Sequence, residues 1–370
     1  MLADLKICFL ALTLGQGGAE RQLYYMLKVL QEQNAHVRLL SLTRGEFWEK
    51  PIEELGVPVT WVGRYRSRIS RLLQIIFELQ EDRPDILQSQ HLFVNMYVAG
   101  AARILGSTEI GAIRNDGVTG VDSIGKLAGY LTLQLPRCIA ANSRAAIANV
   151  TANGVPPERL FFLPNVVDTD LFGPLAPRTD PCVYLTAVGR LVEQKRFDRF
   201  LRVLQHVIRR TDTKVKGVIV GPGSLRIKLE RQVTTLGLCP EQIEFKGKAN
   251  DVASIYRQSD IFVSTSDWEG TPNVILEAMA SGLPVVATRV GDVPDLVTHG
   301  YTGYLVEPED EKTMVEALLQ LIENLDQRKQ FGQRARERVV GNFSLHRLPG
   351  MLNNLYQQVM SNKQQGYPHV

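Results

Sequence analysis

Two patterns of hydrophobic and polar positions alternate along the chain. Short apolar runs of about four to eight residues, typical of buried strands, alternate with longer segments whose apolar residues recur at helical spacing. The helix expected after the first run carries Leu23, Met26, Leu27 and Leu30 on one face. Strands this apolar, separated by helices, predict parallel sheets covered by helices on both faces. The expected strands are 6–13, 37–42, 57–63, 85–90, 109–115, 138–143, 159–165, 183–190, 216–221, 243–247, 261–266, 283–288 and 302–306.

The length of the chain and its prolines predict two domains. A chain of 370 residues exceeds the size of a single core, about 250–300 residues. The segment 164–181 has little periodicity and contains four prolines, so we interpret it as a linker. We expect two doubly wound α/β domains, residues 1–170 and 171–344, that face each other across a cleft. Ligands of such sheets lie beyond the carboxyl ends of the strands.

Composition and charge narrow the class of protein. The net charge of +3 is too small to indicate a nucleic-acid partner. The four cysteines are scattered without a metal-ligand spacing, which favours buried thiols in a reducing compartment. The first apolar run, 7–14, is short and leads into a glycine loop, so we interpret it as a strand rather than a signal peptide. No run has the ~20 apolar residues of a membrane span. We expect a cytoplasmic protein, at most peripheral to a membrane.

The segment EGTPNVILEAM, which begins at Glu269, carries the strongest chemical signal. Thr271 is expected to cap a helix whose first residue is Pro272, so Glu269 lies in the loop before that helix. Asn273 and Glu277 then share one helix face. Backbone N–H groups and two carboxylates therefore converge on one place. A ligand that is anionic at one end and rich in hydroxyls elsewhere, such as a nucleotide sugar, fits this arrangement.

Other loops at strand ends offer weaker signals. Arg190 and Lys195 follow the strand 183–190, where two cations can clamp a pyrophosphate, although a solvated basic loop is the commoner alternative. The turn at Gly221 can approach a phosphate or be a plain turn. The strand that contains Lys246 can pair with a base edge or be simple sheet. Asp168 and its neighbour two residues on imitate a metal-binding pair, but we interpret them as a turn.

The first domain holds three features that each allow two interpretations. The loop with Gly17 and Gly18 either approaches a ligand phosphate or is a tight strand-to-helix turn. His91, just after a strand, either takes part in proton transfer or acceptor binding, or is structural. Four arginines between Arg64 and Arg71 precede a helix with apolar positions. That region either docks on an anionic membrane surface or is a basic loop before a core-facing helix, whose apolar face is Ile69, Leu72, Leu73, Ile76 and Leu79.

Together these motifs resemble the retaining glycosyltransferases of family 4, which have the two-domain GT-B fold. The match is strongest from Val188 to Pro308, through VGRLVEQKRFD, VGPGS, EFKGK, EGTPNVILEAM and TGYLVEPED, and LPNVVDTDLF and GGAER extend it over nearly the whole chain. The resemblance implies an N-terminal acceptor-binding domain and a donor-binding domain. It also implies that the C-terminal helix, about 345–370, crosses back to the N-terminal domain.

The resemblance implies roles for individual residues. Arg190 and Lys195 would bind the phosphates of the donor, and Glu269 would contact the sugar hydroxyls with help from the backbone of Gly270 and Thr271. The remaining donor-binding candidates are Pro272, Asn273 near the phosphate, Glu277 at the ribose, Gly17 and Gly18 from the other domain, Gly221 and Lys246.

One position departs from the family. Many members have a histidine at the end of the strand 109–115, where this sequence has Arg114 and Asn115. The role of that histidine therefore cannot be transferred. His91 is a candidate substitute, and His91, Arg114 and Asn115 are the acceptor-side candidates.

The resulting hypothesis is a metal-independent, retaining hexosyltransferase without a cofactor. It would transfer a hexose or N-acetylhexosamine from a nucleoside-diphosphate sugar, UDP-linked rather than GDP-linked, to a hydroxyl of a glycan or lipid-linked acceptor. The alternatives are a nucleotide-sugar epimerase or a phosphorylase of the same architecture, or a non-catalytic nucleotide-sugar binder. An epimerase would consume the donor without an acceptor, and a phosphorylase would carry a pyridoxal-binding lysine.

Overall fold

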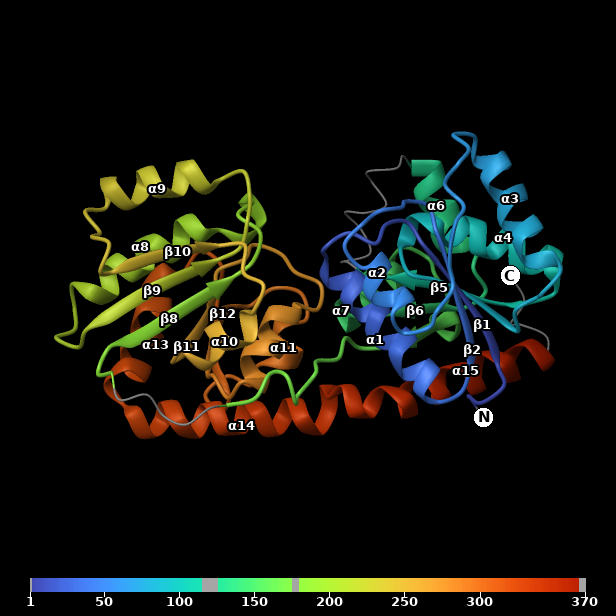
Figure 1. Cartoon of the computed structure of the whole chain (residues 1–370). Helices are drawn as coiled ribbons and strands as arrows, with labels where there is room; N and C mark the ends of the chain where they lie inside the picture. The colour runs from blue at the N-terminus through green and yellow to red at the C-terminus, as the bar shows by residue number, and fades with distance from the viewer. Residues whose placement is uncertain (1, 115–125, 175–179, 366–370) are drawn as a thin grey trace. The chain divides into compact units, whose positions relative to one another are not determined.

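A computed structural model describes residues 2–114, 126–174 and 180–365, and they form two compact units. The first unit comprises residues 1–165 and 346–370, and the second comprises residues 166–345. Each unit is built on one sheet of parallel strands, and each of the thirteen predicted strands is present (Figure 1).

The seven-stranded sheet of the first unit has the order β3-β2-β1-β4-β5-β6-β7. Its strands are β1 (Lys6–Ala11), β2 (His36–Ser41), β3 (Val59–Trp61), β4 (Ile86–Ser89), β5 (Thr108–Ile113), β6 (Ile139–Ala141) and β7 (Leu160–Phe162). The order reverses direction at β1, which pairs with β2 on one side and β4 on the other. Such a reversal is the place where doubly wound sheets bind ligands beyond the carboxyl ends of their strands.

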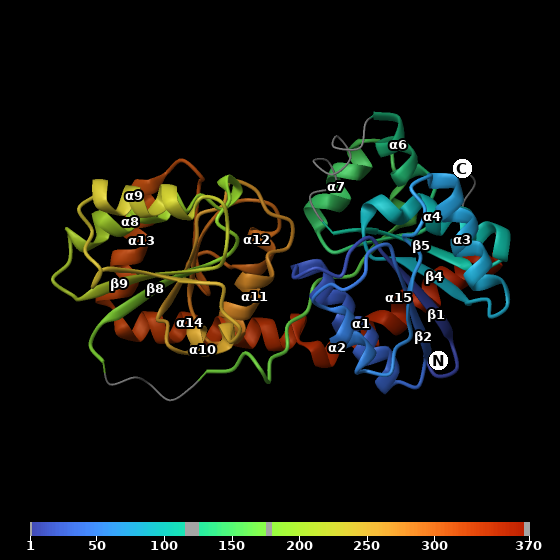
Figure 2. The same cartoon turned by 45° about the horizontal axis from the view of Figure 1, so that its top comes forward.

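Helices cover both faces of this first sheet, as the apolar strands require. The helices are α1 (Gly18–Glu32), α2 (Glu49–Glu53), α3 (Arg68–Gln80), α4 (Asn95–Leu105), α6 (Lys126–Gln134), α7 (Arg144–Ala152) and α15 (Leu348–Gln364). Cys8 and Leu10 of β1 pack with buried residues of α3 and α4 on one face. Figure 2 shows α1 and α15 together on the face opposite α3 and α4.

The six-stranded sheet of the second unit has the order β10-β9-β8-β11-β12-β13. Its strands are β8 (Val183–Val188), β9 (Val215–Val220), β10 (Ile243–Gly247), β11 (Ile261–Ser264), β12 (Val285–Thr288) and β13 (Gly303–Val306). Its helices are α8 (Phe197–Ile208), α9 (Arg226–Thr235), α10 (Val252–Arg257), α11 (Asn273–Ala280), α12 (Val293–Leu296), α13 (Glu311–Glu323) and α14 (Leu325–Phe343). One core cluster lies under α8 and α13, and another lies under α10, α11 and α14 (Figure 1).

The C-terminal helix α15 packs on the first unit. It follows a short 3-10 turn, Leu345–Arg347, and contacts α1 and β5. Tyr356 on α15 is fully buried, and its hydroxyl donates a hydrogen bond to Oε1 of Gln88, 2.9 Å away. The last helix therefore crosses back to the first unit, as the resemblance to GT-B enzymes predicts. Among the described residues, no helix has the length and apolar character needed to cross a bilayer.

The segment that the sequence presents as a linker is partly integrated into the second unit. Val167 forms a β-bridge with Ser344, and Phe172 is buried in the core under α11. The carboxylate of Asp168 accepts hydrogen bonds from the N–H groups of Asp170 and Leu171, at 3.1 and 2.9 Å. Asp168 is thus the turn residue that the sequence indicates.

Two expectations about burial are corrected. On α3, Leu79 is buried, but Ile69 is 72% exposed and Leu73 is 61% exposed, so these two do not face the core. The sheet behind α3 accommodates only part of its apolar face. The expectation of buried thiols is also wrong for Cys239, which is exposed in the turn between α9 and β10, whereas the other three cysteines are buried.

Candidate functional site

Lys195 and Glu269 form an ion pair at the carboxyl ends of neighbouring strands. Lys195 follows β8 and Glu269 follows β11, and these two strands pair in parallel, so their end loops lie side by side. The ammonium of Lys195 contacts Oε1 of Glu269. Both side chains are mostly buried, with 17% and 7% of their surfaces exposed. The fold therefore brings together two of the three residues predicted to be catalytic.

The carboxylate of Glu269 retains one unused oxygen. Oε1 accepts hydrogen bonds from Lys195 and, at 2.7 Å, from the hydroxyl of Ser266. Within the described residues, no hydrogen bond to Oε2 is present. An ionised carboxylate accepts on both oxygens, so Oε2 is able to accept from a ligand hydroxyl. Lys195 likewise has three N–H donors, of which this contact with Glu269 uses one.

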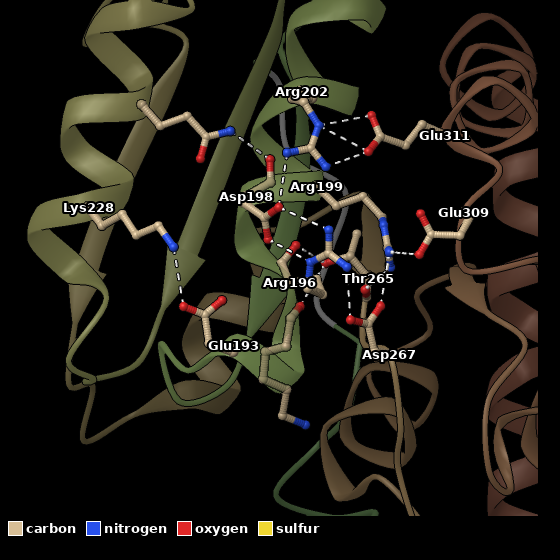
Figure 3. Close-up of polar contacts among 12 residues, drawn as sticks. Glu193, Arg196, Asp198, Arg199, Arg202, Lys228, Thr265, Asp267, Glu309 and Glu311 are labelled. Atoms are coloured by element: carbon tan, nitrogen blue, oxygen red, sulfur yellow. Dashed lines mark hydrogen bonds and ion pairs between the residues drawn. The ribbon is translucent and has the colours of Figure 1, made fainter.

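The residue after Lys195 holds the loop in an unusual conformation. Arg196 has φ = +48° and ψ = +46°, the left-handed region that glycine normally occupies. Its guanidinium binds Asp198 at 3.0 and 3.2 Å and Asp267 at 2.9 Å (Figure 3). Hydrogen bonds to Asp198 and then Asp267 raise the pKa of Arg196. A carboxylate at the start of α8 and another in the loop after β11 thus hold the side chain of the residue next to Lys195.

A second arginine, on α8, binds the loop after β11 from inside the unit. Arg199 is 1% exposed, and its guanidinium donates to the carbonyl of Thr265 at 2.8 Å and pairs with Asp267 at 2.9 Å (Figure 3). The hydroxyl of Thr265 lies 2.9 Å from the carbonyl oxygens of both Lys195 and Arg196. The loop that carries Lys195 is therefore bonded at its backbone to the loop that carries Glu269.

Arg190 differs from Lys195 because it is exposed. Within the described residues, no acidic side chain lies within ion-pair distance of Arg190. Its loop is shaped by close backbone packing, since a Cβ on Gly221, at φ = +135°, would lie 2.0 Å from the carbonyl oxygen of Gly189. Gly221 thus has a structural role in this loop. A phosphate role for either residue stays a prediction.

The loop from Glu269 to Asn273 corrects one detail of the expected cap. The helix α11 begins at Asn273, so Pro272 is the N-cap residue and Thr271 precedes it. The hydroxyl of Thr271 instead donates to Asp292 at 2.8 Å, and the N–H of Asp292 donates to the carbonyl of Gly270 at 3.2 Å. The loop after β12 therefore holds in place the loop that carries these donor-binding candidates, whose donor contacts stay predictions.

Glu277 and Lys246 have protein partners in the structure. Glu277 on α11 is 3% exposed, and its Oε2 accepts from the hydroxyl of Tyr256 at 3.1 Å. Lys246 on the edge strand β10 pairs with Glu244 at 2.8 Å. Glu277 is therefore held at the inner side of α11, and Lys246 lies two strands away from β8. Their donor contacts remain predictions.

The other candidates belong to the first unit. The N–H of Leu12 donates to Nδ1 of His91 at 3.2 Å, so Nε2 carries the proton that faces Glu20 at 3.1 Å. Both ring nitrogens are thus occupied, which favours the structural interpretation of His91. Gly17 is the N-cap of α1, which begins at Gly18.

Arg114 follows β5 and contacts the sulfur of Met26 at 3.8 Å, and burial lowers its pKa to about 10. Asn115 lies outside the described residues.

Sequence reasoning missed the residues that orient the charged pair. Thr265, Ser266 and Asp267 lie between the end of β11 and Glu269. The acidic residue Asp267, three positions past this buried strand, is the signal in the sequence that could have indicated them. Arg196 and Arg199 were not singled out, because arginine gives no sign of a left-handed backbone or of burial. Within the described residues, no group of three or more histidine, cysteine or acidic side chains is arranged to hold a metal ion.

The fold is shared with solved glycosyltransferases. HepE from Anabaena, solved in complex with UDP, matches with a TM-score of 0.83 at 19% identity, over 95% of this chain and 100% of that chain. The two parallel-sheet units and the returning C-terminal helix define the GT-B class.

Family models and curated relatives place the chain within that class. The model described as Glycosyl transferases group 1 matches residues 183–324, and Glycosyltransferase Family 4 matches residues 16–171. The chain belongs to this family of glycosyltransferases.

N-acetyl-alpha-D-glucosaminyl L-malate synthase of Bacillus anthracis is 30% identical over 49% of this chain and 47% of the relative. UDP-Gal:alpha-D-GlcNAc-diphosphoundecaprenol alpha-1,3-galactosyltransferase of Escherichia coli is 28% identical over 56% of this chain and 57% of the relative. The matches thus span about half the length of these two relatives.

Proposed function

We propose that this glycosyltransferase transfers a hexose or N-acetylhexosamine from a UDP-linked donor to a hydroxyl of a glycan or lipid-linked acceptor, with retention and without a metal. The observation that carries the proposal is the Lys195–Glu269 pair, built at the carboxyl ends of β8 and β11 in a chain of this family. A UDP-linked donor fits the UDP complex of HepE, and a lipid-linked acceptor fits the name of the galactosyltransferase relative.

The proposed reaction proceeds on one face of the donor. The bond between the anomeric carbon and the phosphate oxygen breaks, and the acceptor oxygen bonds to that carbon on the same face. The departing phosphate oxygen takes the proton of the acceptor hydroxyl, so no other base is required. Lys195 and Arg190 stabilise the negative charge that grows on the diphosphate. Oε2 of Glu269 accepts from a sugar hydroxyl and orients the ring.

The contact between Lys195 and Glu269 supports this division of roles. Glu269 fixes the ammonium through one of its three N–H donors, and the other two remain for phosphate oxygens. The ammonium in turn holds the carboxylate in place for the sugar. Arg190 is exposed and adds a second positive charge at the end of the same strand.

The proposal includes the acceptor side of the protein. A lipid-linked acceptor would be reached at a membrane, and the arginines from Arg64 to Arg71 are the charged region of the first unit suited to an anionic membrane surface.

The test combines donor binding with turnover. A panel of nucleotide sugars is screened by thermal shift, where a donor at 100 times its dissociation constant adds about 2.7 kcal/mol to the stability. Release of UDP is then followed with candidate acceptors. We expect Lys195→Ala and Glu269→Ala to slow turnover by about 10²–10³-fold, as loss of one preorganised charge does.

A matched control lies on α9, beside the loop that carries Lys195. Lys228 pairs with Glu193 at 3.2 Å, two residues before Lys195, and both partners are exposed (Figure 3). Lys228→Ala therefore removes a neighbouring ion pair without touching Glu269, and we expect turnover to stay normal. Near-normal rates for Lys195→Ala and Glu269→Ala would overturn the site. Consumption of the donor with no acceptor present would show an epimerase instead.

A further inference from the structure

An exposed apolar stripe runs along α3 in the first unit. Ile69, Leu73 and Phe77 are 72%, 61% and 67% exposed. Successive residues of an α-helix are rotated by about 100°, so side chains four positions apart differ by about 40° and these three lie within an arc of about 80°. Three large apolar side chains on one open arc form a continuous surface rather than scattered exposure.

The stripe is distinct from the face that holds α3 to the sheet. Ile75 and Leu79 are buried in the core beneath α3, and Leu72 and Ile76 pack against that core while half-buried. α3 therefore has a wide apolar surface, of which one part packs on the unit and the adjoining part faces outward. Packing within the unit accounts for the apolar residues on the inner part of α3, but not for Ile69, Leu73 and Phe77 on the outer part.

Positive charge gathers at the N-terminal end of the same helix. Arg64, Arg66 and Arg68 are exposed, and Arg71 donates to the carbonyl of Tyr65 at 2.6 Å. In the described part of the chain, no acidic side chain forms an ion pair with any of these four arginines. The region from Arg64 to Phe77 thus combines unneutralised positive charge with an open apolar stripe.

We propose that α3 docks this protein on an anionic lipid surface, with Ile69, Leu73 and Phe77 inserted at the headgroup boundary and the arginines against lipid phosphates. A helix that lies in a membrane interface needs both features at once, an apolar face without a protein partner and adjoining basic residues. A protein groove would accept the apolar stripe but gives no reason for four unpaired arginines at its end.

The charges along α3 also set its direction on the surface. Acidic residues appear only toward the C-terminal end of the helix, at Glu78 and Glu81. An anionic surface repels that end and attracts the arginine end. The N-terminal half of α3 therefore inserts more deeply than the C-terminal half, and Ile69 and Leu73 contribute more than Phe77.

This inference rests on the proposed function, because it says how the enzyme would reach a lipid-linked acceptor. Its test measures vesicle binding and does not depend on catalysis. The full chain is sedimented with vesicles of phosphatidylcholine alone or mixed with phosphatidylglycerol, at low and high salt. We expect binding to the anionic vesicles only, and weaker binding at high salt because salt screens exposed charges. Donor binding, measured by thermal shift on the same samples, reports separately on the sugar-nucleotide site.

Two sets of substitutions separate the apolar and the charged contribution. The triple variant Ile69→Ser, Leu73→Ser and Phe77→Ser should bind anionic vesicles at least about tenfold more weakly, because binding scales with inserted apolar area. These side chains are exposed, so the melting temperature should be retained. The second set replaces Arg64, Arg66 and Arg68 by serine. It should lower partitioning by about 100-fold, since each arginine near such a surface contributes about fivefold.

A control of the same chemistry lies on α9 in the second unit. Ile227 is 64% exposed, and its neighbours Arg226 and Lys228 are paired with Glu230 and Glu193. It is therefore an exposed isoleucine between neutralised cations, and Ile227→Ser should leave vesicle binding unchanged.

Equal sedimentation with both kinds of vesicle would overturn the proposal, as would full binding by the triple serine variants. A concentration-dependent dimer that the stripe variant abolishes, without vesicle binding by the parent protein, would assign the stripe to self-association and reject the membrane.

Discussion

Arg196 allows the strain in the catalytic loop to be measured apart from its ion pairs. Its backbone is left-handed, at φ = +48°, and its side chain bridges Asp198 and Asp267. For a residue with a Cβ, this conformation costs about 1–2 kcal/mol, which glycine avoids. Arg196→Ala removes the bridge and keeps the strain, whereas Arg196→Gly removes the same bridge and relieves the strain.

The expected changes in unfolding free energy follow from the exposure of Arg196, Asp198 and Asp267. The three side chains are 24–29% exposed, so their ion pairs are partly screened and together contribute about 1–2 kcal/mol. Arg196→Ala should therefore lose about that amount of unfolding free energy. Arg196→Gly should recover about 1 kcal/mol of it. In a unit of this size, that difference corresponds to about 2–4 °C in melting temperature.

The assay compares both variants with Arg196→Lys, which keeps the charge but cannot reproduce the two-carboxylate fork of arginine. The difference in melting temperature between the alanine and glycine variants measures the backbone strain. Their kcat, and their KM for the donor, show how the change affects Lys195. We expect alanine to be the least stable and to lower kcat more than glycine does. Alanine keeps the strained backbone without the bridge that holds it, so the loop shifts and moves the ammonium of Lys195 away from Glu269. If alanine melts at or above the temperature of glycine, the backbone at Arg196 stores no strain and the reasoning fails.

Further predictions concern other parts of the molecule. In a urea-unfolding cycle, Lys195→Met and Glu269→Gln should each cost about 2–3 kcal/mol, and both together no more than one alone, because each single change strands a buried partner; additive losses would mean that the pair is uncoupled. Gly291→Ala should abolish most turnover and lower the melting temperature, since its Cβ would lie 2.0 Å from the carbonyl oxygen of Glu269. Gly300→Ala, with a similar positive φ but open space, should cost only about 1 kcal/mol of stability and leave turnover intact. A thiol reagent at pH 8 should modify Cys239 alone in the native protein and all four cysteines after denaturation, because burial raises the pKa of two of the other thiols to about 12; rapid reaction of a second thiol would contradict the described burial.

The strands were predictable because their signal is local. A buried parallel strand must be apolar along its length, so each apolar run identified its strand without knowledge of the rest of the chain. The site loops followed from topology, since parallel strands that pair bring their carboxyl ends together. Glu269 and Lys195 could be proposed from the sequence on that basis, although 74 positions separate them.

What escaped prediction depends on contacts between distant segments. Helical spacing shows that α3 has an apolar face, but it does not show how much of that face the sheet covers. The core-facing alternative is therefore wrong for Leu73, which is exposed. The left-handed backbone at Arg196 left no trace because glycine is the residue that normally marks it. Burial of Arg199 depends on Asp267 and a carbonyl from another loop, which no local pattern reveals.

The contacts that the sequence did not reveal order the side chains of the site before a donor binds. Ordering a long side chain at a binding site costs about 0.5–1.5 kcal/mol, and a side chain that is already held avoids that cost. Lys195 is held at its ammonium by Glu269 and at its carbonyl by Thr265, before any donor is bound. The carboxylates of Asp198 and Asp267 bind the guanidinium of the next residue, Arg196, and not the ammonium of Lys195 (Figure 3). The network thus fixes the position of the Lys195 charge while leaving N–H donors available, which is the condition for stabilising charge that appears only during the reaction.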